Sequence, residues 1–262
     1  MQDSSVPPLR DAATVVLVRQ SDKNLQIYLM RRSTRSGFMG GLYVFPGGTV
    51  DEQDRDTDFW CSKTDLSEHE VNYRLCDERF TFKDAVSFST AAIRETLEEA
   101  GVLIASADGK SLQDFELMAQ KRLEPDLTPD WFRQSIDQMD WTLSFSNLGP
   151  WSHWITPEKM KKRFDTRFFI VFMPENQKCV PDNLETNHGI WIHPADALKH
   201  NLTGEIPLSP PTVVTLTQLQ QFESINSLKS ELINRGWNEP ISPKMILTDQ
   251  GPVIIEPWDP DF

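Results

Sequence analysis

The sequence lacks any long apolar run, and no stretch approaches the roughly 20 consecutive hydrophobic residues that a membrane-spanning helix needs. Met1–Arg10 has neither the basic start nor the apolar core of a signal peptide. The last residues, Pro260-Asp261-Phe262, are not of the Ser-Lys-Leu type that addresses proteins to peroxisomes. We therefore expect a cytoplasmic protein without a membrane partner.

Cysteine and histidine are scarce, with three and five residues in a chain of 262. Cys61, Cys76 and Cys179 are odd in number, widely spaced and outside any CxxC pair, which argues against a disulfide framework and against a zinc knuckle. The histidines show no HExxH or related spacing. We expect reduced thiols and no histidine among the metal ligands.

Basic residues are outnumbered, with 26 Lys and Arg against 39 Asp and Glu, giving a net charge of −13. Nonspecific binding to nucleic acid or to anionic membranes depends on a basic face, so the composition argues against both partners. If the substrate is a small anion, a divalent cation or a local basic patch has to overcome this charge.

The hydrophobic periodicity predicts a mixture of strands and helices without regular βαβ alternation, which favours an α+β fold. The acidic stretch 51–82 has no regular hydrophobic period, so we expect a polar insertion with one short helix at 67–75, and whether it is ordered is left open. The expected strands are 11–20, 25–31, 42–45, 102–105, 167–173 and 189–192, and the expected helices are 83–100, 112–123, 129–138, 196–200, 210–225 and 227–235.

Three glutamates stand out in the helix predicted at 83–100. Glu95, Glu98 and Glu99 are spaced i, i+3 and i+4, which places their carboxylates on one helix face. Such a cluster is often only a solvated acidic face, but all-oxygen ligands also suit a hard divalent cation such as Mg²⁺ or Mn²⁺. Arg94 is placed to orient one of these carboxylates, and Gly101 ends the helix directly after the cluster.

A glycine-rich loop precedes this helix. It ends in Phe45-Pro46-Gly47-Gly48, a sequence that lets backbone approach a ligand closely. Together the loop and the helix resemble the signature of the Nudix hydrolases, G-x5-E-x7-R-E-U-x-E-E-x-G-U, in which U is a bulky aliphatic residue. The second half is matched by Arg94, Glu95, Glu98, Glu99, Gly101 and Val102.

The first half of the signature departs from the family pattern. Gly48 opens it, Asp54 stands where the family usually has Glu, and Thr96 occupies the first U position. The usual gap of seven residues is replaced by 39 residues, 55–93, which leaves the role of Asp54 open. A long insertion is tolerable because loop-closure entropy grows only logarithmically with length.

This interruption resembles one branch of the family, the peroxisomal-type diphosphatases of coenzyme A (CoA) and acyl-CoA. Similarity to that branch extends to Leu29, Arg32, Ser33, Gly41 and 45–48, and further to 151–157, 163–166, Glu185, Trp191, Pro194 and 210–211. The basic residue that the CoA signature usually places four before Gly41 is Gly37 here, with Arg35 as the nearest substitute.

The resemblance implies one Nudix domain over residues 1–262, with a mixed β-sheet sandwiched between α-helices, an insertion at 51–83 and a helical C-terminal extension at 205–262. It also implies a metal-dependent pyrophosphohydrolase that cleaves CoA or acyl-CoA to 3′,5′-ADP and (acyl-)4′-phosphopantetheine. The alternatives are hydrolysis of another diphosphate, such as ADP-ribose, NADH or a dinucleoside polyphosphate, and a noncatalytic binding module of the same fold.

The residues expected at the site follow from the same resemblance. Glu95, Glu98 and Glu99 would hold Mg²⁺ or Mn²⁺, Arg94 would orient them, and either Glu98 or Glu185 would act as the general base. The expected substrate contacts are Arg32, Arg35, Gly47, Gly48 and Trp154. Arg31, Arg32 and Arg35 either bind phosphate or form a solvated basic turn. The basic run Lys159, Lys161, Lys162 and Arg163 is expected as a solvated helix edge, with attraction of an anionic substrate as the alternative. Trp151 and Trp154 either line the substrate pocket or belong to the core.

Overall fold

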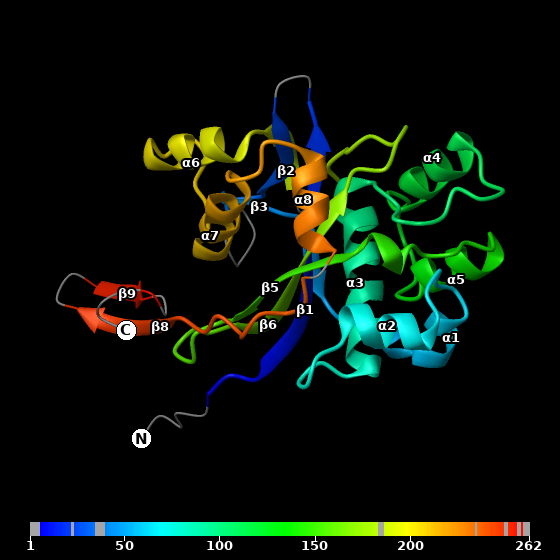
Figure 1. Ribbon diagram of the computed structural model, residues 1–262, viewed down its shortest axis with the longest axis horizontal. Coiled ribbons are helices and arrows are strands. Elements are labelled where there is room, and N and C mark those ends of the chain that lie inside the picture. Colours follow the sequence, from blue (N-terminus) through cyan, green and yellow to red (C-terminus); the bar gives the residue numbers. More distant parts are fainter. Residues whose placement is uncertain are drawn as a thin grey trace.

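The computed structural model describes residues 6–21, 24–34, 40–182, 186–233, 235–248, 251–255 and 258. At its centre is a seven-stranded mixed sheet with the order β3-β2-β1-β6-β5, to which β4 adds beside β1 and β7 beside β2 (Figure 1). Strands β1 and β6 are parallel, whereas the other pairs are antiparallel. The strands are β1 (Leu9–Gln20), β2 (Leu25–Arg32), β3 (Tyr43–Val44), β4 (Gly47–Thr49), β5 (Gly149–Ile155), β6 (Arg163–Phe172) and β7 (Thr186–Ile192).

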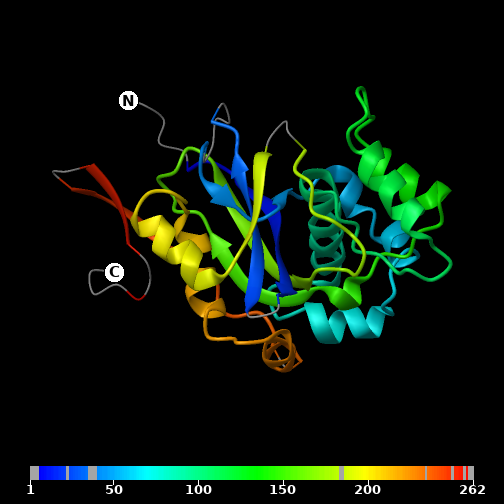
Figure 2. The ribbon, with the colours of Figure 1, turned by 90° about the horizontal axis from the view of Figure 1, so that it is seen from above.

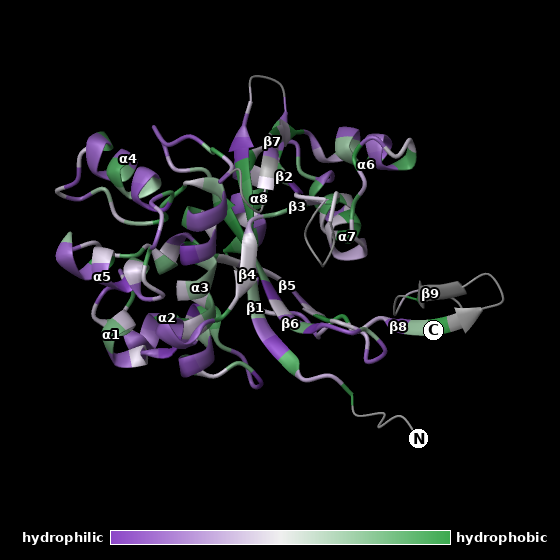
Figure 3. Ribbon diagram, turned by 180° about the vertical axis from the view of Figure 1, so that it is seen from behind, coloured by the Kyte–Doolittle hydropathy of each residue, from purple (hydrophilic) through white to green (hydrophobic). Residues whose placement is uncertain are grey.

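Helices cover the sheet on both sides, which confirms the predicted α+β sandwich (Figures 1 and 2). One side carries η1 (Glu52–Arg55), α1 (Thr57–Cys61), α2 (Glu68–Leu75), α3 (Phe82–Ala100), α4 (Leu112–Lys121), α5 (Trp131–Gln138) and η2 (Phe145–Asn147), and the other carries α6 (Pro194–Leu202), α7 (Pro210–Leu219) and α8 (Ile225–Leu232). The outer helices α2, α4 and α6 mix hydrophilic and hydrophobic residues (Figure 3). No helix in the described part of the chain is long and apolar enough to cross a membrane.

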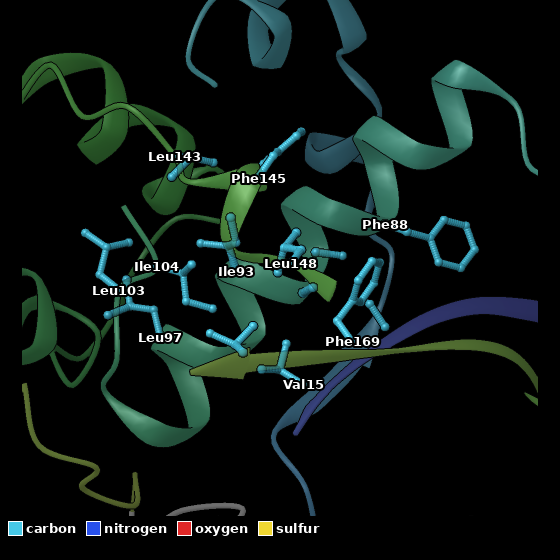
Figure 4. Packing of buried hydrophobic residues seen from close by; sticks show 14 of the residues in the cluster. Val15, Phe88, Ile93, Leu97, Leu103, Ile104, Leu143, Phe145, Leu148 and Phe169 are labelled. Carbon is cyan, nitrogen blue, oxygen red and sulfur yellow. The ribbon is translucent and has the colours of Figure 1, made fainter. Parts of the chain in front are cut away.

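Two hydrophobic cores lie on the two faces of the sheet. Side chains alternate along β1, so Ala13 and Val15 belong to the core under α3, whereas Val16 and Val18 belong to the core under α6–α8. Figure 4 shows the first core, in which Val15 of the sheet meets α3. The sheet is therefore buried on both faces.

The helix predicted at 83–100 is confirmed as α3, the longest helix in the described ranges. It begins with a capping box, because the Thr81 side chain accepts from the Asp84 amide and the Asp84 carboxylate accepts from the Thr81 amide. It ends at Gly101, whose left-handed φ of 71° favours glycine. Both ends of the helix that carries the glutamates are thus fixed by local sequence.

The insertion, whose order the sequence left open, is folded. It forms η1, α1 and α2, of which α2 confirms the short helix expected at 67–75, and it buries Trp60, Val71 and Leu75 in the core under α3. The apolar residues of this stretch are too irregularly spaced to produce a periodic pattern, yet they supply enough buried surface to order it.

Three expectations need correction. The strand expected at 102–105 is not formed, and only an isolated bridge joins Ala105 to Leu143. The basic run around Lys159 and Lys162 lies in the turn between β5 and β6 and is not a helix edge. The C-terminal extension contains the expected helices α7 and α8, but adds an unpredicted hairpin of β8 (Lys244–Thr248) and β9 (Gly251–Ile255), which projects from the body (Figure 1).

Candidate active site

A pocket of about 440 Å³ opens beside the central strands β1 and β6. Its sheet residues include Ala12 and Thr14 of β1, which alternate with core residues Ala13 and Val15, so the pocket lies on the face covered by α6–α8. The remaining walls come from the β3–β4 loop, α3, the β5–β6 turn and the start of α7. They include Arg32, Val44, Phe45, Gly47, Gly48, Thr49, Glu95, Glu99, Trp154, Ile155, Thr156, Pro157, Met160, Lys162, Phe164, Thr166, Phe168, Ser209, Pro210, Pro211, Thr212 and Pro243.

Two carboxylates of α3, those of Glu95 and Glu99, face this pocket beside the glycine loop. The Gly47 amide donates a hydrogen bond to Glu99 Oε2 at 2.9 Å. A Cβ atom on Gly48 would lie 2.5 Å from Glu95 Oε1, so only glycine leaves room for that carboxylate. At Gly47 a Cβ atom would lie 2.3 Å from the carbonyl oxygen of Ala13, and φ is +154°. Packing against backbone therefore requires glycine at Gly47, whereas a side chain at Gly48 would displace the Glu95 carboxylate.

Arg94 is the buried centre of the site, with 2% of its surface exposed. Its Nε and Nη2 donate to the two oxygens of Asp54 at 3.0 and 2.8 Å, a bidentate pair. Nη2 also donates to the carbonyl of Thr49 at 2.8 Å. Asp54 is fully buried, so the acid of the first half of the signature meets the arginine of the second half despite the long insertion.

The third glutamate, Glu98, lies on the other side of Arg94. Nη1 of Arg94 donates to Glu95 Oε1 at 2.9 Å and to Glu98 Oε2 at 2.8 Å. The indole Nε1 of Trp131, in α5, donates to Glu98 Oε1 at 3.1 Å. Glu98 does not line the pocket. The structure thus brings two of the three glutamates to the pocket and holds the third between Arg94 and α5.

The electrostatics of this cluster favour an additional cation. One guanidinium faces four carboxylates, those of Asp51, Asp54, Glu95 and Glu98. Burial raises the pKa of Glu95 to about 8, although Arg94 opposes the shift. Burial also raises the pKa values of Asp54 and Glu98, again against the effect of Arg94. The negative charge is therefore incompletely compensated by protein groups.

The donor set fits a hard divalent cation. Within the described ranges, no three His, Cys, Asp or Glu side chains form a ready-made metal cage. Mg²⁺, however, commonly binds through one or two carboxylates and completes its coordination with water and substrate phosphates. Glu95 and Glu99 provide two such carboxylates at the wall of an open pocket, where Gly48 leaves space.

The predicted substrate contacts are partly brought together. Arg32, Gly47, Gly48 and Trp154 all line the pocket. Trp154 is also a core residue, 4% exposed, whereas Trp151 is 1% exposed and packs under Arg235 at 3.9 Å. Two predicted residues, Arg35 and Glu185, lie outside the described residues, so their roles and the choice of general base stay predictions.

Several residues that the structure places at the site were not among the site residues predicted from the sequence. Trp131 contacts Glu98 from 33 residues away, and the proline pair that begins α7 forms a pocket wall. Lys162 was grouped with its lysine neighbours, yet it lines the pocket whereas Lys159 and Lys161 do not. Only the Pro210-Pro211 pair carried a sequence signal, through the family resemblance.

Comparisons with known proteins find similar sequences and a similar fold. A family model described as the NUDT19 Nudix domain matches residues 9–219. The acyl-coenzyme A diphosphatase NUDT19 of Xenopus laevis is 30% identical over 250 residues, covering 83% of this chain and 66% of the relative. The human protein of that name is 28% identical over 275 residues, covering 90% and 72%. The chain therefore spans about two thirds of the length of these curated relatives.

A solved structure shares the fold. The crystal structure of a NUDIX hydrolase from Alicyclobacillus acidocaldarius superimposes with a TM-score of 0.66 and 22% sequence identity. The match covers 86% of this chain and 97% of the other. At this identity the likeness concerns the fold alone.

Proposed function

The chain belongs to the Nudix hydrolase family, and from that premise we propose that it cleaves the diphosphate of CoA or acyl-CoA to 3′,5′-ADP and (acyl-)4′-phosphopantetheine. The observation that carries the proposal is the pair of carboxylates, Glu95 and Glu99, packed against Gly47-Gly48 at one end of a pocket with a long apolar wall. Relatives named as acyl-CoA diphosphatases support this choice of substrate.

In the proposed mechanism Glu95 and Glu99 hold Mg²⁺ or Mn²⁺. Such an ion, when bound, supplies Lewis-acid neutralisation of the diphosphate and lowers the pKa of a water molecule. Arg94 fixes the Glu95 carboxylate through the bond from Nη1 and anchors its own position on Asp54. The Gly47 amide fixes Glu99. Arg32 lines the same pocket and can bind phosphate oxygens with its guanidinium fork.

The apolar wall is suited to the non-ionic parts of the proposed substrate. It includes Trp154, Phe168, Pro210 and Pro211, and the register places Phe168 at the level of Gly47, because both are opposite Thr14 of β1. Ligand pockets commonly combine an extended hydrophobic surface with a few polar groups that fix orientation. This wall can take the adenine ring or the pantetheine arm while the carboxylate end binds the diphosphate through the metal.

The test is an analysis of reaction products. Purified protein is incubated with CoA, ADP-ribose or NADH, with and without Mg²⁺, and the products are separated by chromatography. We expect 3′,5′-ADP and 4′-phosphopantetheine from CoA only when Mg²⁺ is present. Rapid cleavage of ADP-ribose without cleavage of CoA would contradict the proposed substrate, and activity that is unaffected by metal removal would contradict the proposed chemistry.

A further inference from the structure

The pocket has a second cationic group far from its carboxylate end. Among the described residues, the basic side chains that line the pocket are Arg32 and Lys162. Arg32 ends β2, and Lys162 directly precedes β6 in the turn that follows β5. The chain as a whole carries a net charge of −13, which repels anions. A lysine at the pocket wall provides a positive charge at the place where an anionic substrate would bind.

The two cations lie on different segments of the pocket wall. Ala13 of β1 is opposite Gly48 on one side and Arg167 on the other, so Gly48 lies at the level of Arg167 along β6. The Arg32 amide donates to the Leu42 carbonyl at 2.9 Å, which places Arg32 beside the start of the segment that leads to Gly48. A Cβ atom on Gly48 would touch the Glu95 carboxylate.

Lys162 lies at the other end. It is five positions before Arg167 along the chain, and β6 begins at the next residue, Arg163. At about 3.3 Å per strand residue, the Lys162 backbone is roughly 16 Å from the level of Gly48. This separation exceeds the reach of the four-carbon lysine stem, so the Lys162 ammonium cannot serve the group that is bound at the carboxylates.

The wall between Lys162 and the glycine loop is largely apolar. Phe164 and Trp154 line the pocket between them together with Thr166, and the register places Phe168 at the level of Gly47. A ligand that lies along this wall presents its diphosphate to the end at Glu95 and Glu99 and any further anionic group to Lys162. A nucleotide with a second phosphate on its ribose carries such a group.

We propose that Lys162 forms a subsite for a phosphate monoester, separate from the diphosphate end of the pocket. The inference rests on the proposed function and refines it, because CoA carries a 3′-phosphate on its ribose whereas ADP-ribose and NADH do not. Lys162 is then a specificity-determining residue that selects nucleotides with this extra phosphate. It has no part in the bond cleavage itself.

The neighbouring lysine provides a matched control. Lys161 is exposed like Lys162 and belongs to the same turn, but it does not line the pocket. Alanine at either position removes one exposed charge without disturbing the core. A general effect of charge on substrate attraction would change both variants alike, whereas a subsite effect is confined to Lys162→Ala.

The first measurement is ligand binding, which is independent of turnover. Isothermal titration of wild type, Lys162→Ala, Lys162→Arg and Lys161→Ala uses 3′,5′-ADP and AMP, which differ by the 3′-phosphate. We expect Lys162→Ala to weaken 3′,5′-ADP binding about ten-fold, as for loss of one charge-assisted hydrogen bond, and to leave AMP binding within two-fold of wild type. Lys162→Arg should retain most of the affinity, and Lys161→Ala should match wild type.

The second measurement compares hydrolysis of CoA and dephospho-CoA. Lys162→Ala should raise KM for CoA about ten-fold with kcat nearly unchanged, and should leave both constants for dephospho-CoA unchanged. Equal losses for both members of either ligand pair, or no loss for 3′,5′-ADP, would overturn the subsite. If wild type cleaves neither CoA nor dephospho-CoA, the proposed function fails, while the titrations still decide the role of Lys162.

Discussion

Replacing Arg94 by Lys should destabilise the protein strongly although the charge is retained. The guanidinium makes five hydrogen bonds, to Asp54 twice, to the Thr49 carbonyl, to Glu95 and to Glu98. An ammonium has three donors on one atom, so at least two of these bonds are lost and the fully buried Asp54 loses its bidentate partner. Breaking a buried charged pair in this way costs about 3 to 5 kcal/mol.

The corresponding change in melting temperature can be measured by circular dichroism. At about 2 to 4 °C per kcal/mol for a chain of this size, Arg94→Lys should lower Tm by roughly 10 °C. The control is Arg55→Lys, whose partner is Asp11 in a pair with exposed side-chain fractions of 40% and 36%. Solvent screening makes such a pair worth less than about 1 kcal/mol, so this Tm should fall by only a few degrees at most. Equal shifts in the two variants would refute the claim that Arg94 organises the site.

Further predictions concern the loop, the helix contact and the thiols. Gly48→Ala should lower kcat at least ten-fold with Tm nearly unchanged, because its Cβ displaces only the end of the flexible Glu95 side chain; an active variant would contradict the close packing. Trp131→Phe should weaken Mn²⁺ binding about ten-fold, because it frees Glu98, which shares the Arg94 Nη1 donor with the metal-binding Glu95. Trp141→Phe, which removes a buried indole N–H without a hydrogen-bond partner, should leave Mn²⁺ binding unchanged. Equal titration curves for the two variants would exclude this positioning role. Cys179, whose pKa burial raises to about 12, should react with iodoacetamide at pH 8 at least 100-fold more slowly in the native than in the unfolded protein, as followed by mass spectrometry of the peptides; similar rates would show that the thiol is not protected.

Local sequence determines the carboxylate end of the site. The helix limits of α3 follow from Thr81 and Gly101, and the i, i+4 spacing puts Glu95 and Glu99 on one side of that helix. The sequence also predicts that the Gly47-Gly48 backbone approaches a partner closely, and at Gly48 the structure shows the Glu95 carboxylate in that place. These features depend on residues near one another in the chain, which is why periodicity and motif spacing predict them.

Contacts between distant segments could not be predicted in this way. Glu98 was expected to bind metal with the other two glutamates, and that role stays a prediction. The structure shows that Glu98 does not line the pocket and accepts hydrogen bonds from Arg94 and Trp131. The spacing of residues along α3 does not indicate that a side chain of α5 donates a hydrogen bond to Glu98. The pairing of Asp54 with Arg94 was likewise uncertain, because the folded insertion that brings them together has no regular hydrophobic period.

The distinction between neighbouring lysines depends on the sheet. In the sequence Lys161 and Lys162 belong to one basic run with no feature that separates them. The register of β6 against β1 and the path of the β5–β6 turn decide that Lys162 alone of the two lines the pocket. Which of the two lysines lines the pocket can therefore be known only once the pairing of the strands is known.

The central claim is that Glu95 and Glu99 together bind a divalent cation beside the glycine loop. Its most direct test is anomalous diffraction from crystals of the wild-type protein and of Glu99→Gln, both soaked in MnCl₂. The account predicts an anomalous peak within bonding distance of both carboxylates in wild type, and a weak or absent peak in the variant, which keeps the side-chain shape but loses the charge. A wild-type crystal at saturating Mn²⁺ with no peak between Glu95 and Glu99 would contradict it.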